Sequence, residues 1–391
     1  MNKIFSAIAV CLFGACLTAC KQEEIRRGEI IGVKELGVYD AARLDELKKS
    51  LPFAFPPARN SVRLRKVIYG TAGLDGTPVK ASGLLIVPEG VAAELPVLSY
   101  QHGVALNRSD VPSGAKTTDV LLLAAYFGAN GYVVLAPDYL GLGESAGTHP
   151  YLHARSEASA AEDLLRAVRA LPDLKLSGRL FLAGYSQGAH AALALQRSLE
   201  APGAGAFPYK LAGTAGMSGP YDVSGTCFPE LLRAPSQASA AYLAYLVFAM
   251  NNIYKVFPNL SAALQPPYDK AVPSLFDGKH RAVEIVNALP AAPGELFRPE
   301  LLQALGKEPA HPLNAALRDN DVYNWKPLAP VRLYYGKADR DVPPENSLKA
   351  AKRMKAAGSD ARAINVGDAL DHQTAVGPAF TAALEWFETL K

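Results

Sequence analysis

Cysteine is scarce in this sequence, and most of it stands at the start of the chain. Cys11, Cys16 and Cys20 lie within the first twenty residues, and Cys227 stands alone in the rest. If the chain is cleaved before Cys20 and that thiol carries a lipid, no free pair remains to form a disulfide. A lone Cys227 is typical of a small packed side chain. No Cys and His cluster has the spacing of a zinc site, so we expect no metal.

Charge of one sign and regular repeats are also lacking. The 40 basic residues are balanced by 37 acidic ones, and no long run of one sign occurs, which excludes a basic stripe for nucleic acid. The 32 glycines and 29 prolines follow no fixed period, so collagen-like and solenoid structures are excluded. A hydrophobic content of 49% and a charged content of 20% are instead sufficient for a globular protein with a large core.

The first residues have the pattern of a secretion signal. Lys3 precedes an apolar run over residues 4–17, which is short for a membrane span and has the length of a secretory signal core. The run ends in Leu17-Thr18-Ala19-Cys20, which resembles a bacterial lipobox. The resemblance implies a signal peptide over residues 1–19, a lipid on Cys20 and anchoring to a membrane. Lys21 in the next position implies the outer membrane, with the protein facing the periplasm or the exterior.

Strand and helix patterns alternate after residue 61, which predicts an α/β fold with a mainly parallel central sheet and helices on both faces. Strands are expected at residues 62–69, 81–87, 97–100, 132–136, 179–183, 211–215, 331–335 and 361–366. Helices are expected at residues 41–49, 118–130, 156–171, 186–199, 344–357 and 374–390, with Ser156 as a cap. Residues 20–60 are interpreted as the lipidated Cys20, a tether and one short helix. The core is expected in residues 61–219 and 331–391.

Residues 220–330 break this alternation, with helical and proline-punctuated patterns and few strands. Within them, residues 242–250 are apolar on every side but too few to span a membrane. We interpret residues 220–330 as a helical cap or lid over the edge of the sheet. Their aromatic side chains are typical either of ordinary packing or of an apolar substrate wall.

One short motif carries the chemistry of a nucleophile. Gly184-Tyr185-Ser186-Gln187-Gly188 has the pattern G-x-S-x-G between a predicted strand and a predicted helix. In such a turn the two glycines leave room for a tight approach of the backbone, and the serine is strained with its oxygen exposed. The N-terminus of the following helix favours negative charge beside that oxygen. Ser186 is therefore the predicted nucleophile.

A serine hydroxyl needs a base, and the base needs a carboxylate to orient it. With this motif the acid and then the histidine follow the serine along the chain. Of the seven histidines, only His372 lies after a strand that could carry the acid and just before the last helix. The loop after residues 331–335 offers Asp339, our first choice, and Asp341, which is more typical of a helix cap.

The reaction also needs N–H donors for a developing oxyanion. The backbone N–H of Gln187, directly after the serine, is the first expected donor. The second is expected from the loop after residues 97–100, at Val104 or else at Gly103, where glycine lets the backbone turn sharply. His102 is expected to brace this loop.

These residues together resemble the α/β-hydrolase superfamily over residues 62–391. The resemblance is carried by His102-Gly103, by residues 138–145, by the motif around Ser186, by residues 336–343 and by Asp371-His372. Residues 137–145, 149–151 and 218–222 further resemble bacterial relatives of the secretory lipase family. Fungal members of that family usually carry disulfides that this chain cannot form. Asp138 is expected to brace its loop.

The resemblance implies a serine hydrolase that cleaves carboxylic esters through an acyl-serine, as a carboxylesterase or lipase, without a cofactor. The expected partners are a small and apolar ester and the membrane that holds Cys20, with the oligomeric state left open. A peptidase or acyltransferase would use the same triad and stays an alternative. An inactive surface-binding lipoprotein is an alternative of another class, and the presence of Ser186, an acid and His372 argues against it.

Overall fold

The structure is a computed structural model that describes residues 24–391, except residues 50, 53, 116, 204–206 and 237. The predicted signal peptide, Cys20 and Lys21 lie outside the described residues. Within the described part of the chain, no helix has the length and apolar character needed to cross a membrane.

A single nine-stranded sheet forms the centre of the molecule, in the order β1-β2-β3-β5-β4-β6-β7-β8-β9. The first three strands pair antiparallel and β3 joins β5 in the same way, whereas all pairs from β5 to β9 are parallel. The predicted mainly parallel α/β fold is therefore confirmed. The strands are β1 Ile30–Tyr39, β2 Val62–Ala72, β3 Pro78–Pro88, β4 Leu95–Gln101, β5 Val133–Pro137, β6 Leu176–Tyr185, β7 Lys210–Met217, β8 Val331–Gly336 and β9 Ala361–Gly367.

Strand β1 corrects the interpretation of residues 20–60 as a tether with one helix. It is an edge strand of ten residues along β2, and it is followed by the predicted short helix, α1 Ala41–Lys48. The mixed charges of residues 20–60 led to the wrong interpretation. In the structure, Glu35 of β1 pairs across the strands with Arg63 at 3.5 Å and with Arg65 at 2.8 Å. Mixed charges on this segment therefore belong to the exposed face of an edge strand.

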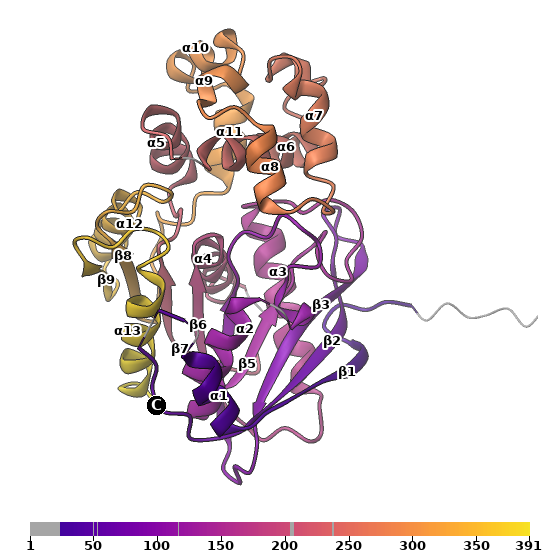
Figure 1. The fold of residues 1–391 in the computed structure, drawn as a ribbon, viewed down its shortest axis with the longest axis vertical. Helices are drawn as coiled ribbons and strands as arrows, with labels where there is room; N and C mark the ends of the chain where they lie inside the picture. Colours follow the sequence, from indigo (N-terminus) through magenta and orange to yellow (C-terminus); the bar gives the residue numbers. More distant parts are fainter. Residues whose placement is uncertain (1–23, 50, 53, 116, 204–206, 237) are drawn as a thin grey trace, which may run out of the picture.

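Helices cover both faces of the sheet (Figure 1). One face packs against α3, α4 and α12, and the other against α1, α2 and α13, each around its own apolar cluster. Because both faces are buried, the second halves of the central strands β4, β6 and β7 are fully buried, and those of β6 and β7 are mainly apolar. These helices are α2 Thr118–Leu122, α3 Ala154–Arg169, α4 Gln187–Leu199, α12 Glu345–Ala356 and α13 Val376–Glu388.

Three local expectations were wrong. The predicted helix at residues 118–130 ends as α2 and continues as a π-helical turn, Leu123–Phe127, and a 3₁₀ turn, Gly128–Asn130. Ser156 does not cap α3, because the helix already begins at Ala154 and the Ser156 hydroxyl donates back to the His153 carbonyl at 3.1 Å. Asp341 does not cap α12, whose N-cap is Pro344.

Residues 220–330, called the cap below, hold a third apolar cluster that surrounds helix α6. Figure 1 shows the cap helices together at one end of the molecule. The cap is therefore packed around its own core as well as against the sheet domain. Its helices are α5 Phe228–Arg233, α6 Ser239–Tyr254, α7 Tyr268–Leu275, α8 Ala282–Ala288, α9 Pro293–Leu296, α10 Pro299–Lys307 and α11 Pro312–Asp319, with a π-helical turn at Val223–Cys227 and a 3₁₀ turn at Leu260–Ala262.

Candidate active site

The turn from β6 to α4 holds Ser186 in a strained backbone conformation. Its φ is +56° and its ψ is −124°, a region that L-residues rarely occupy. A Cβ atom on Gly184 would lie 2.1 Å from the Gly188 carbonyl oxygen, and one on Gly188 would lie 1.8 Å from the Gln101 carbonyl oxygen. Neither position can hold a larger residue unless the backbone shifts. The spacing of the motif thus follows from close backbone packing on both sides of the serine.

The structure brings the three predicted catalytic side chains into one hydrogen-bonded chain. The Ser186 hydroxyl lies 3.0 Å from His372 Nε2, and His372 Nδ1 lies 2.7 Å from Asp339 Oδ2. Asp339 and His372 are buried, with 4% and 7% of their surface exposed. These distances are within the range in which a base can take a proton from a nucleophile.

Backbone N–H groups hold the carboxylate of Asp339 in place. Its second oxygen accepts hydrogen bonds from the Asp341 N–H at 3.0 Å and the Val342 N–H at 2.8 Å. Asp341, the second choice for the acid, thus lies beside the triad but contributes its backbone. The Tyr185 hydroxyl donates to the His372 carbonyl at 2.6 Å. The sequence indicates Tyr185 only as part of the turn, whereas this contact also anchors the histidine loop.

The surroundings of His372 favour its charged form. Burial lowers the pKa of the imidazole, but the hydrogen bond and the negative charge of Asp339 outweigh it, so that the pKa lies above its ordinary value. The nearby charges of Asp341 and Asp371 act in the same direction. An imidazole in such a place can accept the proton of a serine and hold it while a tetrahedral intermediate exists.

The loop after β4 runs beside Ser186. A Cβ atom on Gly103 would lie 3.5 Å from the Tyr185 carbonyl oxygen and 3.8 Å from Ser186 Cβ. Within the described residues, neither the Gln187 N–H nor the Val104 N–H donates to a protein acceptor. Gln187 is the first residue of α4 and Val104 lies on the loop after β4, and their N–H groups stay the predicted oxyanion donors.

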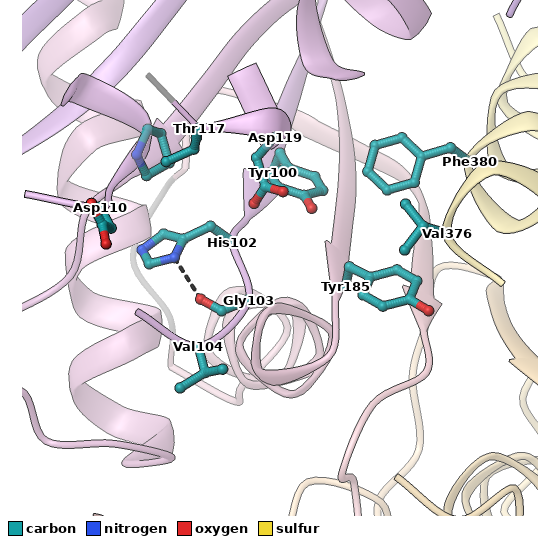
Figure 2. Close-up of a pocket in the computed structure, with 11 residues that line it drawn as sticks. Tyr100, His102, Gly103, Val104, Asp110, Thr117, Asp119, Tyr185, Val376 and Phe380 are labelled. Carbon is teal, nitrogen blue, oxygen red and sulfur yellow. Dashed lines mark hydrogen bonds between the residues drawn. The ribbon is translucent and has the colours of Figure 1, made fainter. Parts of the chain in front are cut away.

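His102 braces this loop, as expected. Its Nδ1 lies 2.7 Å from the Gly103 carbonyl oxygen, and its ring stacks on Tyr139 at 4.4 Å. Figure 2 shows this contact, with Val104 beyond Gly103 and with Asp119 on the other side of the imidazole. Tyr100, Tyr185 and Phe380 line the same pocket. The two ring nitrogens of His102 contact the carbonyl oxygens of Gly103 and Asp138, so its contacts are those of a loop brace.

Asp138 braces the neighbouring loop, also as expected. The carboxylate is fully buried and accepts hydrogen bonds from the Ser82 hydroxyl at 2.5 Å and from the Ser113 N–H at 3.0 Å. Its contacts are therefore structural, and none of them reaches Ser186.

Apolar side chains from both the core and the cap enclose the triad. Cys227 belongs to this enclosure, and burial raises the pKa of its thiol to about 12, so it is a packed wall residue and no thiolate. Asp341 and Val342 close one side of the pocket. The remaining lining residues are Tyr151, Leu152, Pro220, Leu231, Tyr242 and Leu246.

A group of buried polar residues behind the nucleophile was not predicted. The side chain of Gln187 contacts Glu157 and His149, and Glu157 in turn contacts His190. The spacing of Gln187 and His190, three residues apart on one helix, was the only local signal that could have indicated them. Their partners lie about thirty or more residues away in the chain, which no periodicity records.

Comparison with known proteins assigns the family. Residues 102–371, more than half of the chain, match the model of the alpha/beta hydrolase family, and the chain belongs to that family. A search of curated proteins gives no match.

Solved structures agree with this assignment. A candidate hydrolase of Legionella pneumophila has a TM-score of 0.85 and 29% identity, over 93% of this chain and 98% of that chain. The rice cell wall degrading esterase LipA from Xanthomonas oryzae has a TM-score of 0.85 and 28% identity, over 94% of this chain and all of that one. Candida antarctica lipase A in its closed state, at 16% identity and a TM-score of 0.68, shares the fold.

Proposed function

We propose that this protein is a serine hydrolase of carboxylic esters. The observation that carries the proposal is the hydrogen-bonded chain from Ser186 through His372 to Asp339, at 3.0 Å and 2.7 Å. The similarity to a bacterial esterase over nearly the whole of both chains supports ester chemistry over other reactions of the fold.

In the proposed reaction the Ser186 oxygen attacks the ester carbonyl while His372 takes its proton. Asp339 stabilises the imidazolium, and the N–H groups of Gln187 and Val104 bind the oxyanion. His372 then returns the proton to the leaving alcohol, which leaves an acyl-serine. Water attacks the acyl group through the same histidine and releases the acid.

The lining of the pocket favours an apolar substrate. Leu231, Tyr242 and Leu246 of the cap face the triad, and apolar walls of this kind bind acyl chains by burying them. A peptidase or acyltransferase would use the same three residues, and the substrate series described next separates the peptidase from the esterase.

The test is hydrolysis of p-nitrophenyl esters from acetate to palmitate, beside matched peptide anilides, by the full chain and by Ser186→Ala. We expect ester turnover by the parent and a loss of roughly 10⁴-fold or more in the variant. Turnover of anilides alone would identify a peptidase. Equal turnover by parent and variant would exclude Ser186 as the nucleophile, and a folded parent inactive on all substrates would support an acyltransferase of narrow substrate range or a binding lipoprotein.

The same proposal includes a lipid anchor at Cys20, through which the protein is held on a membrane, the outer one where the cell has two. It is supported by the pattern Leu17-Thr18-Ala19-Cys20 followed by Lys21. We expect the parent to incorporate labelled palmitate and to sediment with outer membranes, and Cys20→Ser to do neither. Cys16→Ser is the matched control and should behave as the parent. A labelled Cys20→Ser protein would contradict the anchor.

A further inference from the structure

We propose that a buried network of Glu157, His190 and His149 positions the oxyanion donor by anchoring the side chain of Gln187. The inference rests on the proposed function, in which the Gln187 N–H binds the oxyanion. It assigns a positioning role to residues that do not touch the substrate.

The contacts around Gln187 define the network. Gln187 Nε2 donates to Glu157 Oε1 at 2.8 Å and to His149 Nε2 at 2.8 Å. His149 Nδ1 donates to the Leu140 carbonyl at 2.9 Å, which leaves its Nε2 free to accept. All three side chains are buried, with at most 4% of their surface exposed. The first residue of α4 is thus fixed through its side chain as well as through its backbone.

The second carboxylate oxygen of Glu157 makes a buried ion pair. It lies 2.7 Å from His190 Nδ1, and His190 Nε2 donates to the Asn320 carbonyl at 2.7 Å. Burial opposes the ionisation of Glu157, but the charge and the hydrogen bond of His190 outweigh it and hold the pKa of the carboxyl below its ordinary value. A charged carboxylate is therefore available as a strong acceptor for Gln187.

Asn320 joins this network to the cap. It is buried at the end of α11, and its side chain accepts from the Ala154 N–H at 2.9 Å and donates to the Tyr254 hydroxyl at 3.0 Å. Asn320 therefore connects the end of the last cap helix, α11, to the start of α3 and to the Glu157–His190 pair. The position of the donor N–H therefore depends on contacts that extend into the cap.

Gln187→Met tests the role, because it removes both side-chain hydrogen bonds and keeps the backbone N–H. We expect kcat to fall roughly 10-fold to 100-fold, because misplaced donors lose much of their effect. KM should stay within about threefold of the parent value, since the side chain does not bind substrate. The preference for an ester over its thionoester should also shrink. The sulfur of a thionoester intermediate is little stabilised by oxyanion donors, so its hydrolysis is slowed less when a donor is misplaced. Glu157→Gln should likewise lower kcat and the preference for the ester, and it should leave KM within the same threefold range.

Asp163→Asn is the matched control. Asp163 is a buried acid on the same helix as Glu157, but it contacts Thr71 and Arg27 on the far side from Ser186. We expect this variant to keep the parent kcat and thionoester ratio. If Glu157→Gln fails to fold, Gln187→Met, which leaves the ion pair intact, decides the question. A folded Gln187→Met protein with the parent kcat and ratio would overturn the proposal, as would an equal loss in Asp163→Asn.

Reaction of Ser186 with a fluorophosphonate separates this inference from the proposed function. Phosphonylation uses the same oxyanion donors but no ester substrate. A parent that reacts with the fluorophosphonate but hydrolyses no ester would contradict the proposed function. In that case a slower reaction of Gln187→Met would still support the network. A reaction of Gln187→Met at the parent rate would overturn it. A folded parent that neither hydrolyses esters nor reacts would overturn both.

Discussion

The strand-to-helix turn at Ser186 and the cap helix α6 line the same pocket. A Cβ atom added to Gly184 or to Gly188 would lie 2.1 Å or 1.8 Å from a backbone oxygen. The turn around Ser186 therefore accepts no other residue at these two positions unless the backbone moves. Along α6, eleven of the sixteen residues are buried, and ten of them belong to the apolar cluster of the cap. The conformation of the turn therefore depends on backbone geometry. The stability of the cap depends on filling the volume of its core, which many combinations of apolar residues can do.

After removal of the nucleophile itself, the largest expected effect comes from the acid of the triad. Asp339→Asn keeps the size of the side chain but removes the charge that orients and stabilises the His372 imidazolium. We expect kcat on a short ester to fall roughly 10⁴-fold. Asp341→Asn, in the same loop, should change kcat far less, because Asp341 contributes its N–H. Steady-state kinetics of both variants decide between them, and a larger loss in Asp341→Asn would reverse the assignment.

A pair of glycine substitutions compares the two regions directly. Gly188→Ala would bring a Cβ within 1.8 Å of the Gln101 carbonyl oxygen, and we expect activity to fall by roughly 100-fold or more as the turn shifts. Gly306→Ala in cap helix α10 meets no atom within 4 Å and should stabilise the protein by about 0.5–1 kcal/mol. Kinetics and thermal unfolding of both variants measure the contrast. Equal activity in the two would show that the turn is as tolerant as the cap.

A second pair separates the wall of the pocket from the packing of the cap. Leu246 lines the pocket, whereas Leu243 on the same helix is fully buried and does not. Leu246→Ala should raise kcat/KM for longer acyl chains relative to short ones roughly tenfold, since each methylene that a pocket accepts has an effect of that order. Leu243→Ala should cost about 2–5 kcal/mol of stability and leave the chain-length profile unchanged. The same profile in both variants would remove the cap from substrate selection.

The same contrast explains what the sequence could predict. The motif G-x-S-x-G predicts Ser186, and the order of acid and histidine after it predicts Asp339 and His372. Each of them follows a strand of the parallel sheet, and the ends of parallel strands meet at one edge. Strand β1 was missed because an edge strand with one exposed face carries mixed charges, as a tether does. The Glu157–His190 pair was missed for another reason, since hydrogen bonds between helices far apart in the chain leave no local pattern. The placement of candidate catalytic side chains at strand ends was therefore predictable, and the buried polar contacts behind Ser186 were not.

The smallest predicted effect concerns the pH dependence of the triad. His372 must be neutral to accept a proton, and the charge of Asp339 raises its pKa above the ordinary value. We therefore expect kcat/KM to rise with pH through an apparent pKa above the usual range of histidine and then to level off. Asp371 is exposed and raises the pKa of His372 in the same direction. Asp371→Asn keeps the oxygen that accepts from the Thr374 N–H but removes the charge, so its profile should move toward lower pH with the plateau unchanged.

Asp368→Asn is the control for this measurement, because Asp368 is exposed in the same loop and pairs with Lys337 at 3.5 Å instead. Its profile should coincide with that of the parent. A profile that moves equally in both variants would show that only the overall charge of the loop matters. A profile that moves in neither would show that Asp371 does not contribute and that Asp339 and Asp341 account for the raised pKa of His372. Equal movement would mean that more charges than those beside His372 control its pKa, and no movement would mean that fewer do.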